Sequence, residues 1–282
     1  MKCMVKIYRG KYFVKGNKLS KEALDEIIGN FSEFFREEIV QSHIENTVKL
    51  VRLKEFNLNP FLDIYKARFL TGKDDAKSIA KSLVYARALG TSINTIFGTR
   101  LQKYCSQILD GFGSTTQGID IEFTDMLDGR RKYCQIKAGP NTINKDDVTT
   151  IINHFDGIRN LARTNDLNIG LNDLIVGVFY GTPDQLSNHY KTLNREYPVF
   201  VGKDFWHRLT GHADFYNILA KEMGNIALQY DGTELLDDVI GELSKEIEIF
   251  IKDFIKDSEE EKQRNKDSLG KIKELGEKYK VK

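Results

Sequence analysis

Apolar residues recur at helical spacing through most of the first hundred residues. After Ser20, the positions Leu24, Ile27, Phe31 and Phe34 repeat every three or four residues, which predicts an amphipathic helix whose phenylalanines pack inward. The same spacing continues beyond this segment. It predicts further helices over residues 41–56, 60–70, 74–88 and 92–109.

The pattern changes near residue 110, where a polar stretch over residues 111–118 predicts a flexible connector. Short apolar runs and helical repeats alternate after it. The runs predict strands over 119–126, 132–137, 174–180 and 198–201, and the repeats predict helices over 145–163, 203–227 and 233–256. We therefore expect an α/β (α+β) core between a large helical N-terminal region and a helical C-terminus.

Composition narrows the class of protein. The 282 residues are 40% apolar and 29% charged, which is typical of a folded chain, and no apolar run is long enough to span a membrane. Cys3, Cys105 and Cys134 lie far apart, which argues against a disulfide framework or a zinc knuckle. The lysine-rich N-terminus lacks the apolar core of a secretory signal. We expect a cytoplasmic protein that does not contact a membrane.

The nearly neutral total charge hides a basic segment. Residues 42–105 contain 11 Lys and Arg against 5 Asp and Glu, an excess of six, although the whole chain has a net charge of only +1. Such a segment is typical of a protein that binds an anionic partner such as DNA. A solvated helix face would show the same composition.

A β-hairpin carries the candidate chemistry. Asp128-Gly129 is a strong signal for a two-residue turn, which fixes the pairing of the strands on either side. The predicted cross-strand pairs are Leu127–Arg130, Phe123–Cys134, Glu122–Gln135, Ile121–Ile136 and Asp120–Lys137. Strand alternation puts the apolar pairs on one face and the polar pairs on the other. Two carboxylates, an amide and an ammonium group thus come within reach of one another.

This polar face has two interpretations. It is either a solvated strand face with a cross-strand ion pair or a magnesium site. Magnesium binds a few carboxylate or carbonyl oxygens and keeps several waters. A neighbouring lysine can position an attacking water and offset the negative charge on a phosphate during its transfer.

The residues around the hairpin resemble a known enzyme superfamily. Asp120, followed fifteen residues later by Gln135-Ile136-Lys137, resembles the Asp…(Glu/Gln)-x-Lys core of the PD-(D/E)XK nucleases. The continuation over residues 137–147, Lys-Ala-Gly-Pro-Asn-Thr-Ile-Asn-Lys-Asp-Asp, resembles type II restriction endonucleases, in particular the group that cuts RGGNCCY-type interrupted palindromes. Residues 202–211 are similar to a segment that follows the last core strand in such enzymes. The resemblance covers roughly residues 90–225.

The resemblance implies a fold and a division of the chain. The fold would be a restriction-endonuclease-like core with a mixed β-sheet flanked by helices. Residues 1–90 would form a helical region for dimerisation and DNA contact, residues 91–230 the nuclease core, and residues 231–282 a C-terminal helical segment with a charged tail.

The resemblance also implies roles for the hairpin residues. Asp120 and the backbone carbonyl of Ile136 would bind one or two Mg²⁺ ions, and Lys137 would activate the attacking water. Gln135 departs from the superfamily, which usually has Glu or Asp there; its oxygen can still bind a metal but carries no charge. Three explanations compete: Gln135 is a natural variant, Glu122 supplies the missing negative charge from across the hairpin, or Gln135 is an inactivating substitution. We favour a natural variant assisted by Glu122.

Several residues are candidates for DNA contact. Asn144 is predicted to cap the helix that begins at Lys145, with Asp147 three residues further on. Asn141 and Thr142 precede this helix start, where backbone N–H groups and hydroxyls can bind phosphate. The other candidates are Arg130 and Arg131 at the hairpin turn and Lys77, Lys81 and Arg87 in the basic segment.

The expected function is that of a Mg²⁺-dependent type II restriction endonuclease from a prokaryote. A homodimer suits a palindromic site because each subunit reads one half-site. A cognate DNA methyltransferase is expected in the same restriction–modification system. Two alternatives stay open: a structure-selective repair or junction nuclease, and an inactive DNA-binding protein with a nuclease fold.

Overall fold

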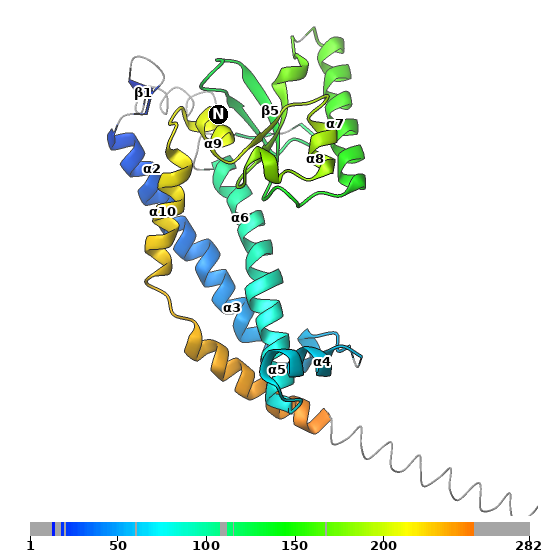
Figure 1. Cartoon of the computed structure of the whole chain (residues 1–282). Helices are drawn as coiled ribbons and strands as arrows, with labels where there is room; N and C mark the ends of the chain where they lie inside the picture. The colour runs from blue at the N-terminus through cyan, green and yellow to red at the C-terminus, as the bar shows by residue number, and fades with distance from the viewer. Residues whose placement is uncertain are drawn as a thin grey trace, which may run out of the picture. The chain divides into compact units, whose positions relative to one another are not determined.

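The computed structural model describes residues 13–14, 18–19, 21–59, 61–107, 112–114, 116–166 and 168–250, which fall into two compact units (Figure 1). Unit 1 comprises Met1–His43 and Ile93–Asp231, and unit 2 comprises Ile44–Ser92 and Gly232–Lys282. The chain passes from one unit to the other after Ser92 and after Asp231, close to the boundaries expected at residues 90 and 230. The segment before residue 44, however, belongs to the same unit as the β-sheet.

A five-stranded mixed sheet forms the centre of unit 1, in the order β3-β4-β5-β6-β7. The strands are β3 (Phe112–Gly113), β4 (Ile121–Thr124), β5 (Arg131–Lys137), β6 (Leu174–Val178) and β7 (Val199–Val201). β3, β4 and β5 pair antiparallel, whereas β6 and β7 continue the sheet in parallel. The expected mixed sheet is thereby confirmed. The connector predicted over 111–118 is wrong at β3, which pairs with the start of β4.

Helices cover both faces of this sheet (Figure 1). One face packs against α2 (Lys21–Phe34), α6 (Ile93–Gln107), α9 (Lys203–Thr210) and α10 (Phe215–Ala227), and the other against α7 (Lys145–Thr164) and α8 (Asn188–Leu193). The single helix predicted over 203–227 is therefore wrong. Gly211, with φ of +73°, ends α9 in the left-handed conformation that a glycine adopts without strain.

Strand alternation divides the core of unit 1 into two clusters. Ile121, Cys134 and Ile136 pack with Phe31 and Phe34 on the α2 side, which confirms that these phenylalanines serve helix packing. Val176 and Val178 pack with Ile151 and Phe155 on the α7 side. The sheet is thus the middle of three layers, and its two faces have separate apolar contacts.

Shorter elements complete unit 1. A two-stranded antiparallel sheet pairs β1 (Phe13–Val14) with β2 (Lys18–Leu19). A π-helix (Phe35–Val40) follows α2 directly, and 3₁₀ turns lie at Leu171–Asp173 and Pro183–Gln185.

Unit 2 is helical. It contains a 3₁₀ turn (Leu53–Glu55), α4 (Asp63–Thr71), α5 (Ala76–Tyr85), a π-helix (Ala86–Ser92) and a helix that begins at residue 233 and is described as far as residue 250. The boundary with unit 1 lies within α3 (Gln41–Lys49), between His43 and Ile44. Its core joins Ile79, Leu83 and Val84 to Ile240 and Leu243. None of the helices in the described part of the chain is long and apolar enough to cross a membrane. The charged tail expected over 257–282 lies outside the described residues.

Candidate active site

The hairpin forms where the sequence predicts it, but with a different register. Ile121 pairs with Cys134 rather than Ile136, and Glu122 pairs with Tyr133 rather than Gln135. The predicted register is therefore wrong by two residues. A shift of two preserves strand alternation, so the side chains of the paired strand residues stay on their predicted faces.

The turn explains the shift. It closes with a hydrogen bond from the Asp125 N–H to the Arg130 carbonyl (2.9 Å), so the loop holds four residues instead of two. The fully buried Asp125 carboxylate accepts the Leu127 N–H at 2.8 Å and forms an ion pair with Arg208 of α9 at 2.9 Å. A contact with a distant helix thus lengthens the turn.

Asp120 directly precedes β4, whose pairing with β5 begins at Ile121 and Cys134. Its N–H donates to the Cys134 carbonyl at 3.0 Å, so Asp120 lies beside the same β5 residue that pairs with Ile121. The Asp120 side chain accepts, through Oδ2, the N–H of Ile136 at 2.7 Å. The carboxylate is therefore fixed to β5 between Gln135 and Lys137.

Gln135 and Lys137 lie on the sheet face that α7 covers. Gln135 is 6% exposed, and its amide nitrogen lies 3.1 Å from Nδ1 of His154, in the third turn of α7. Lys137 is half-buried two residues further on. Among the described residues, none makes a hydrogen bond or ion pair with the Lys137 ammonium group. A carboxylate, an amide and an ammonium group therefore share one face at the end of β5.

Glu122 has other partners. Its Oε2 accepts two hydrogen bonds from Arg131, at 2.9 and 2.6 Å, and its Oε1 accepts the Ser114 hydroxyl at 2.6 Å. Its cross-strand neighbour is Tyr133. The negative charge of Glu122 is thus paired with a guanidinium group.

The loop after β5 leads into α7 as predicted. Asn144 caps the helix: its side chain accepts the Asp147 N–H at 2.9 Å, and the Asp147 carboxylate accepts the Asn144 N–H at 2.8 Å, which confirms the predicted capping pair. The Thr142 hydroxyl donates to the Gly139 carbonyl at 2.9 Å and contacts the Tyr190 hydroxyl at 3.2 Å. Burial raises the pKa of Tyr190 to about 12, so this hydroxyl stays protonated. Asn141 and Lys145 are exposed beside this loop.

Arg130 and Arg131 lie at the opposite end of β5. Lys137 is about 20 Å from Arg131 at the rise of a β-strand. A polar pocket of about 190 Å³ lies beside the two arginines, with Tyr133, Asn168 and Asp173 also in its wall. Arg130 forms a bidentate pair with Asp173, which lowers the pKa of that carboxyl to about 2.

A buried lysine extends this charge network. Lys132 is 1% exposed, and its ammonium group contacts Asp128 at 2.6 Å, the Asn172 carbonyl at 3.0 Å and Asp173 at 3.4 Å. These contacts give the buried ammonium group hydrogen-bond and charge partners on an otherwise apolar sheet face. The remaining DNA-contact candidates belong to unit 2, where Lys77 and Arg87 are exposed and Lys81 lies 5.3 Å above the Tyr85 ring.

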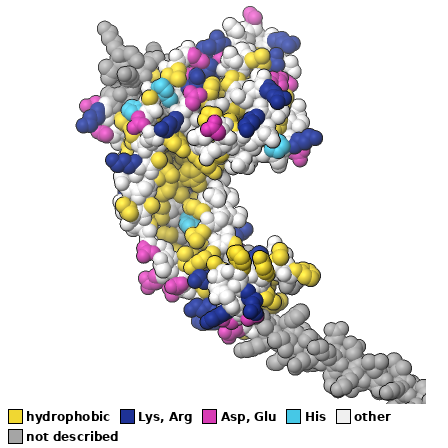
Figure 2. All heavy atoms as spheres, in the orientation of Figure 1, with side chains coloured by type: hydrophobic (Ala, Val, Ile, Leu, Met, Phe, Trp, Pro, Cys, Tyr) yellow, Lys and Arg dark blue, Asp and Glu magenta, His cyan; other side chains and the backbone are white. Residues whose placement is uncertain are grey.

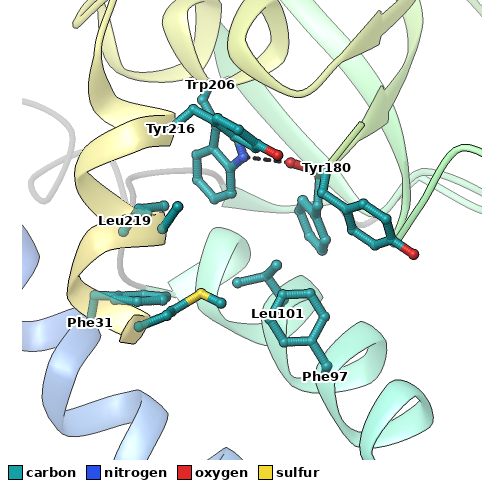
Figure 3. A pocket seen from close by; sticks show the side chains of 10 residues that line it. Phe31, Phe97, Leu101, Tyr180, Trp206, Tyr216 and Leu219 are labelled. Atoms are coloured by element: carbon teal, nitrogen blue, oxygen red, sulfur yellow. Dashed lines mark hydrogen bonds between the residues drawn. The ribbon is translucent and has the colours of Figure 1, made fainter. Parts of the chain in front are cut away.

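An apolar pocket on the opposite side of the sheet is not part of this site. Its volume is about 90 Å³, and Figure 3 shows Phe31, Leu101, Trp206 and Leu219 in its wall. The Trp206 indole donates to the Phe179 carbonyl at 2.8 Å. The lining residues include no carboxylate or lysine, so this pocket lacks groups for phosphodiester chemistry.

The donor set around Asp120 is compatible with a hard divalent cation. Carboxylate, amide and main-chain carbonyl oxygens are the ligands that Mg²⁺ prefers, and Mg²⁺ sites often use only one or two carboxylates together with substrate phosphates. The described residues hold no group of three or more His, Cys, Asp and Glu side chains that could bind a metal. The site thus depends on Asp120 and neutral oxygens.

His154 is the site residue that sequence reasoning missed. It lies 19 residues after its partner Gln135, and only the packing of α7 on β5 brings the two together. The local sequence around His154 contains no motif that could have indicated this contact.

The mixed sheet between helical layers, with Asp120, Gln135 and Lys137 on one face, has the arrangement that the resemblance to nucleases implied. A comparison with protein families supports this class: the family model for type II restriction endonuclease EcoO109I matches residues 22–231. The match covers well over half of the chain, so the chain belongs to this restriction endonuclease family, has a restriction-endonuclease-like fold and is a DNA-binding nuclease. The comparison with curated proteins yields no significant match.

Proposed function

We propose that the protein is a Mg²⁺-dependent, site-specific deoxyribonuclease that hydrolyses both strands of DNA at an interrupted palindrome of the RGGNCCY type. The observation that carries this proposal is the shared sheet face of Asp120, Gln135 and Lys137 in a chain of the restriction endonuclease family.

Each residue of this face has a distinct role. Asp120, the Gln135 side-chain oxygen and the Ile136 carbonyl hold the metal. The bound metal would polarise the scissile phosphate and lower the pKa of a water. Lys137 positions the attacking water and offsets the charge that builds on the phosphate as the ester bond breaks. Glu122 is proposed to add negative charge from the neighbouring strand.

The Ile136 N–H gives this site its rigidity. It donates to Asp120 at 2.7 Å, so the metal-binding carboxylate has one fixed orientation relative to Lys137 on the same strand. A fixed carboxylate lowers the reorganisation needed when the substrate binds.

DNA contacts are proposed at both ends of β5. Asn141, Thr142, Asn144 and Lys145 surround the start of α7, where the helix dipole and N–H groups favour a phosphate near the scissile bond. The pocket beside Arg130 and Arg131 would contact the duplex farther away. Both guanidinium groups already have carboxylate partners, so phosphate binding there exchanges one anion for another.

The central experiment is digestion of mapped plasmid DNA with the purified protein and Mg²⁺, followed by sequencing of the ends. Discrete bands with one common end sequence support a restriction endonuclease. The Lys137→Ala variant is the control and should leave the plasmid intact. Random or structure-dependent cuts would favour a repair or junction nuclease, and binding without any cut would favour an inactive DNA-binding protein.

A homodimer is the proposed active form. Unit 2 exposes large apolar side chains around α4, including Phe61 (88% exposed), Tyr65 (63%) and Phe69 (82%), and Figure 2 shows apolar side chains on the surface of this part of the chain. Exposed apolar groups that gather in this way mark protein–protein contacts. A twofold dimer also matches a palindromic site.

Light scattering at micromolar concentration tests the dimer. The wild type should have twice the mass of one chain, and Phe69→Lys should shift it toward the monomer. Leu228→Lys is the matched control, because Leu228 is 89% exposed but lies in unit 1. A monomeric wild type, with and without cognate DNA, would contradict the proposal.

The proposed activity also implies a partner system. A prokaryotic cell that produces such an endonuclease must protect its own sites, so we propose a cognate DNA methyltransferase that modifies the same sequence. No direct contact between the two proteins is required.

A further inference from the structure

The side chain of Gln135 needs an external partner to fix its orientation. An amide carries an oxygen acceptor and a nitrogen donor on the same carbon, and only the oxygen can bind a cation. A carboxylate at this position would offer two equivalent oxygens. Rotation of the amide by half a turn would instead replace the metal-binding atom by an N–H group.

His154 contacts this amide on its nitrogen side. The Gln135 Nε2 lies 3.1 Å from the His154 Nδ1. Because an amide nitrogen can only donate, Nδ1 must accept, and the ring proton is then on Nε2. Among the described residues, none donates a hydrogen bond to the Gln135 Oε1.

The imidazole ring is itself held in place. A Cβ atom added to Gly118 would lie 2.2 Å from the His154 Cγ, so the ring packs directly on the Gly118 backbone. Gly118 has φ of +80° and precedes Asp120 by two residues. Ile151 and Phe155, which flank His154 on α7, are buried in the core beneath the sheet. The ring therefore lies between a fixed backbone segment and the Gln135 amide.

We propose that His154 is a positioning residue that orients the Gln135 amide so that its oxygen is available as a metal ligand beside Asp120. This inference rests on the proposed function, because it gives His154 a task only if Gln135 binds a metal. With Nδ1 as the acceptor, His154 matches the N–H of glutamine, whereas a carboxylate at this position would require a protonated Nδ1 that donates. His154 and Gln135 thus form a complementary pair, as expected for a natural variant of the superfamily motif.

The first test needs neither metal nor DNA. Long-range proton–nitrogen NMR on protein with ¹⁵N-labelled histidine identifies the protonated ring nitrogen, and the His154 signal is the one absent from His154→Ala. We expect a proton on Nε2 and, in ¹⁵N-glutamine-labelled protein, a hydrogen-bonded Gln135 amide that loses its shift in His154→Ala. A proton on Nδ1 would mean that the amide is reversed and would overturn the proposal.

The second test measures metal affinity. Mn²⁺ binding to the complex with a cognate duplex that carries phosphorothioates at the cleavage position is compared for the wild type and three variants. His154→Ala should bind Mn²⁺ about tenfold or more weakly, as is typical when a residue that orients a metal ligand is lost. His154→Asn supplies an oxygen acceptor near the position of Nδ1 and should restore most of the affinity. Asn153→Ala, at an exposed neighbouring position on α7, is the matched control and should match the wild type.

These outcomes separate the two proposals. Metal-dependent cleavage by the wild type together with unchanged Mn²⁺ affinity in His154→Ala would overturn the role of His154 and leave the nuclease function intact. A wild type that cleaves no DNA with Mg²⁺ or Mn²⁺ would refute the proposed function, whereas the NMR experiment would still decide how His154 and Gln135 are paired.

Discussion

Substitution of Asp120 by Asn and by Ala can separate the structural role of this residue from its catalytic role. The Asp120 Oδ2 accepts the Ile136 N–H at 2.7 Å, which holds β4 and β5 together at the site. Asn keeps an oxygen in nearly the same position but removes the charge. Ala removes both the charge and the acceptor.

The structure gives different magnitudes for the two variants. Asn exchanges a charge-assisted hydrogen bond for a neutral one, which should lower the free energy of unfolding by about 1 kcal/mol. Ala leaves the N–H of Ile136, a residue that is 6% exposed, without its acceptor, which should cost about 1–3 kcal/mol. Cleavage should fall by at least about 10³-fold in both, or ~4 kcal/mol in activation free energy, because both lose the carboxylate that is proposed to hold the metal.

Three measurements check this prediction. Urea unfolding gives the stability of each variant, single-turnover cleavage at saturating Mg²⁺ gives the rate, and fluorescence anisotropy without metal gives DNA affinity. DNA binding should persist or improve in Asp120→Asn, since a negative charge beside the scissile phosphate is removed. Cleavage by Asp120→Asn within tenfold of the wild type would refute the metal role. Equal destabilisation by Asn and Ala would refute the hydrogen-bond reasoning.

Three further predictions address charges outside this pair. If Glu122 supplies charge to the metal, Glu122→Gln should reduce cleavage by orders of magnitude and a second change, Gln135→Glu, should partly restore it; full activity in the single variant would exclude the assistance. The lowered pKa of Asp173 should stabilise the fold by about 1–2 kcal/mol above pH 4, compared with the Asp173→Asn variant. Urea unfolding should show that this difference disappears as the pH falls toward 2. Three basic side chains of unit 2 are predicted to contact DNA phosphates: Lys77, Lys81 and Arg87. Their joint neutralisation should flatten the salt dependence of DNA binding, and an unchanged slope would place the contact elsewhere.

The periodicity of apolar residues was sufficient to predict most of the fold. Burial on one side of a helix or strand leaves a repeat in the sequence, and this repeat identified most of the elements from α2 to β7 within a few residues at most ends, although it missed the six-residue helix α8. The strand β3 was missed because two residues carry no repeat. The division of 203–227 into α9 and α10 depends on the backbone conformation of Gly211, which periodicity does not report.

In the candidate site, too, the sequence predicted local features but not contacts between distant segments. Strand alternation correctly assigned Gln135 and Lys137 to one face, because the parity of each position does not depend on the register. The register itself depends on the ion pair between Asp125 and Arg208, which are 83 residues apart in the chain. The contact of His154 with Gln135 likewise depends on tertiary packing. Local sequence therefore predicted which β5 side chains share this face, but not which residues of other elements contact them.

The charge balance of the site leads to a last prediction. Asp120 and Lys137 cancel each other, Gln135 is neutral, and in the protein without DNA the charge of Glu122 is paired with Arg131. A face without net negative charge repels a DNA phosphate little but attracts a free divalent cation weakly, so the phosphate itself must supply much of the attraction for the metal. Metal and DNA should therefore strengthen each other's binding, by the same factor in each direction. Calorimetry with Mn²⁺ on the free protein and on its complex with an uncleavable duplex should show at least tenfold tighter binding in the complex, and Gln135→Glu should reduce this ratio by improving metal binding to the free protein. Equal Mn²⁺ affinity with and without DNA would show that the protein alone provides a complete metal site, contrary to the donor set around Asp120.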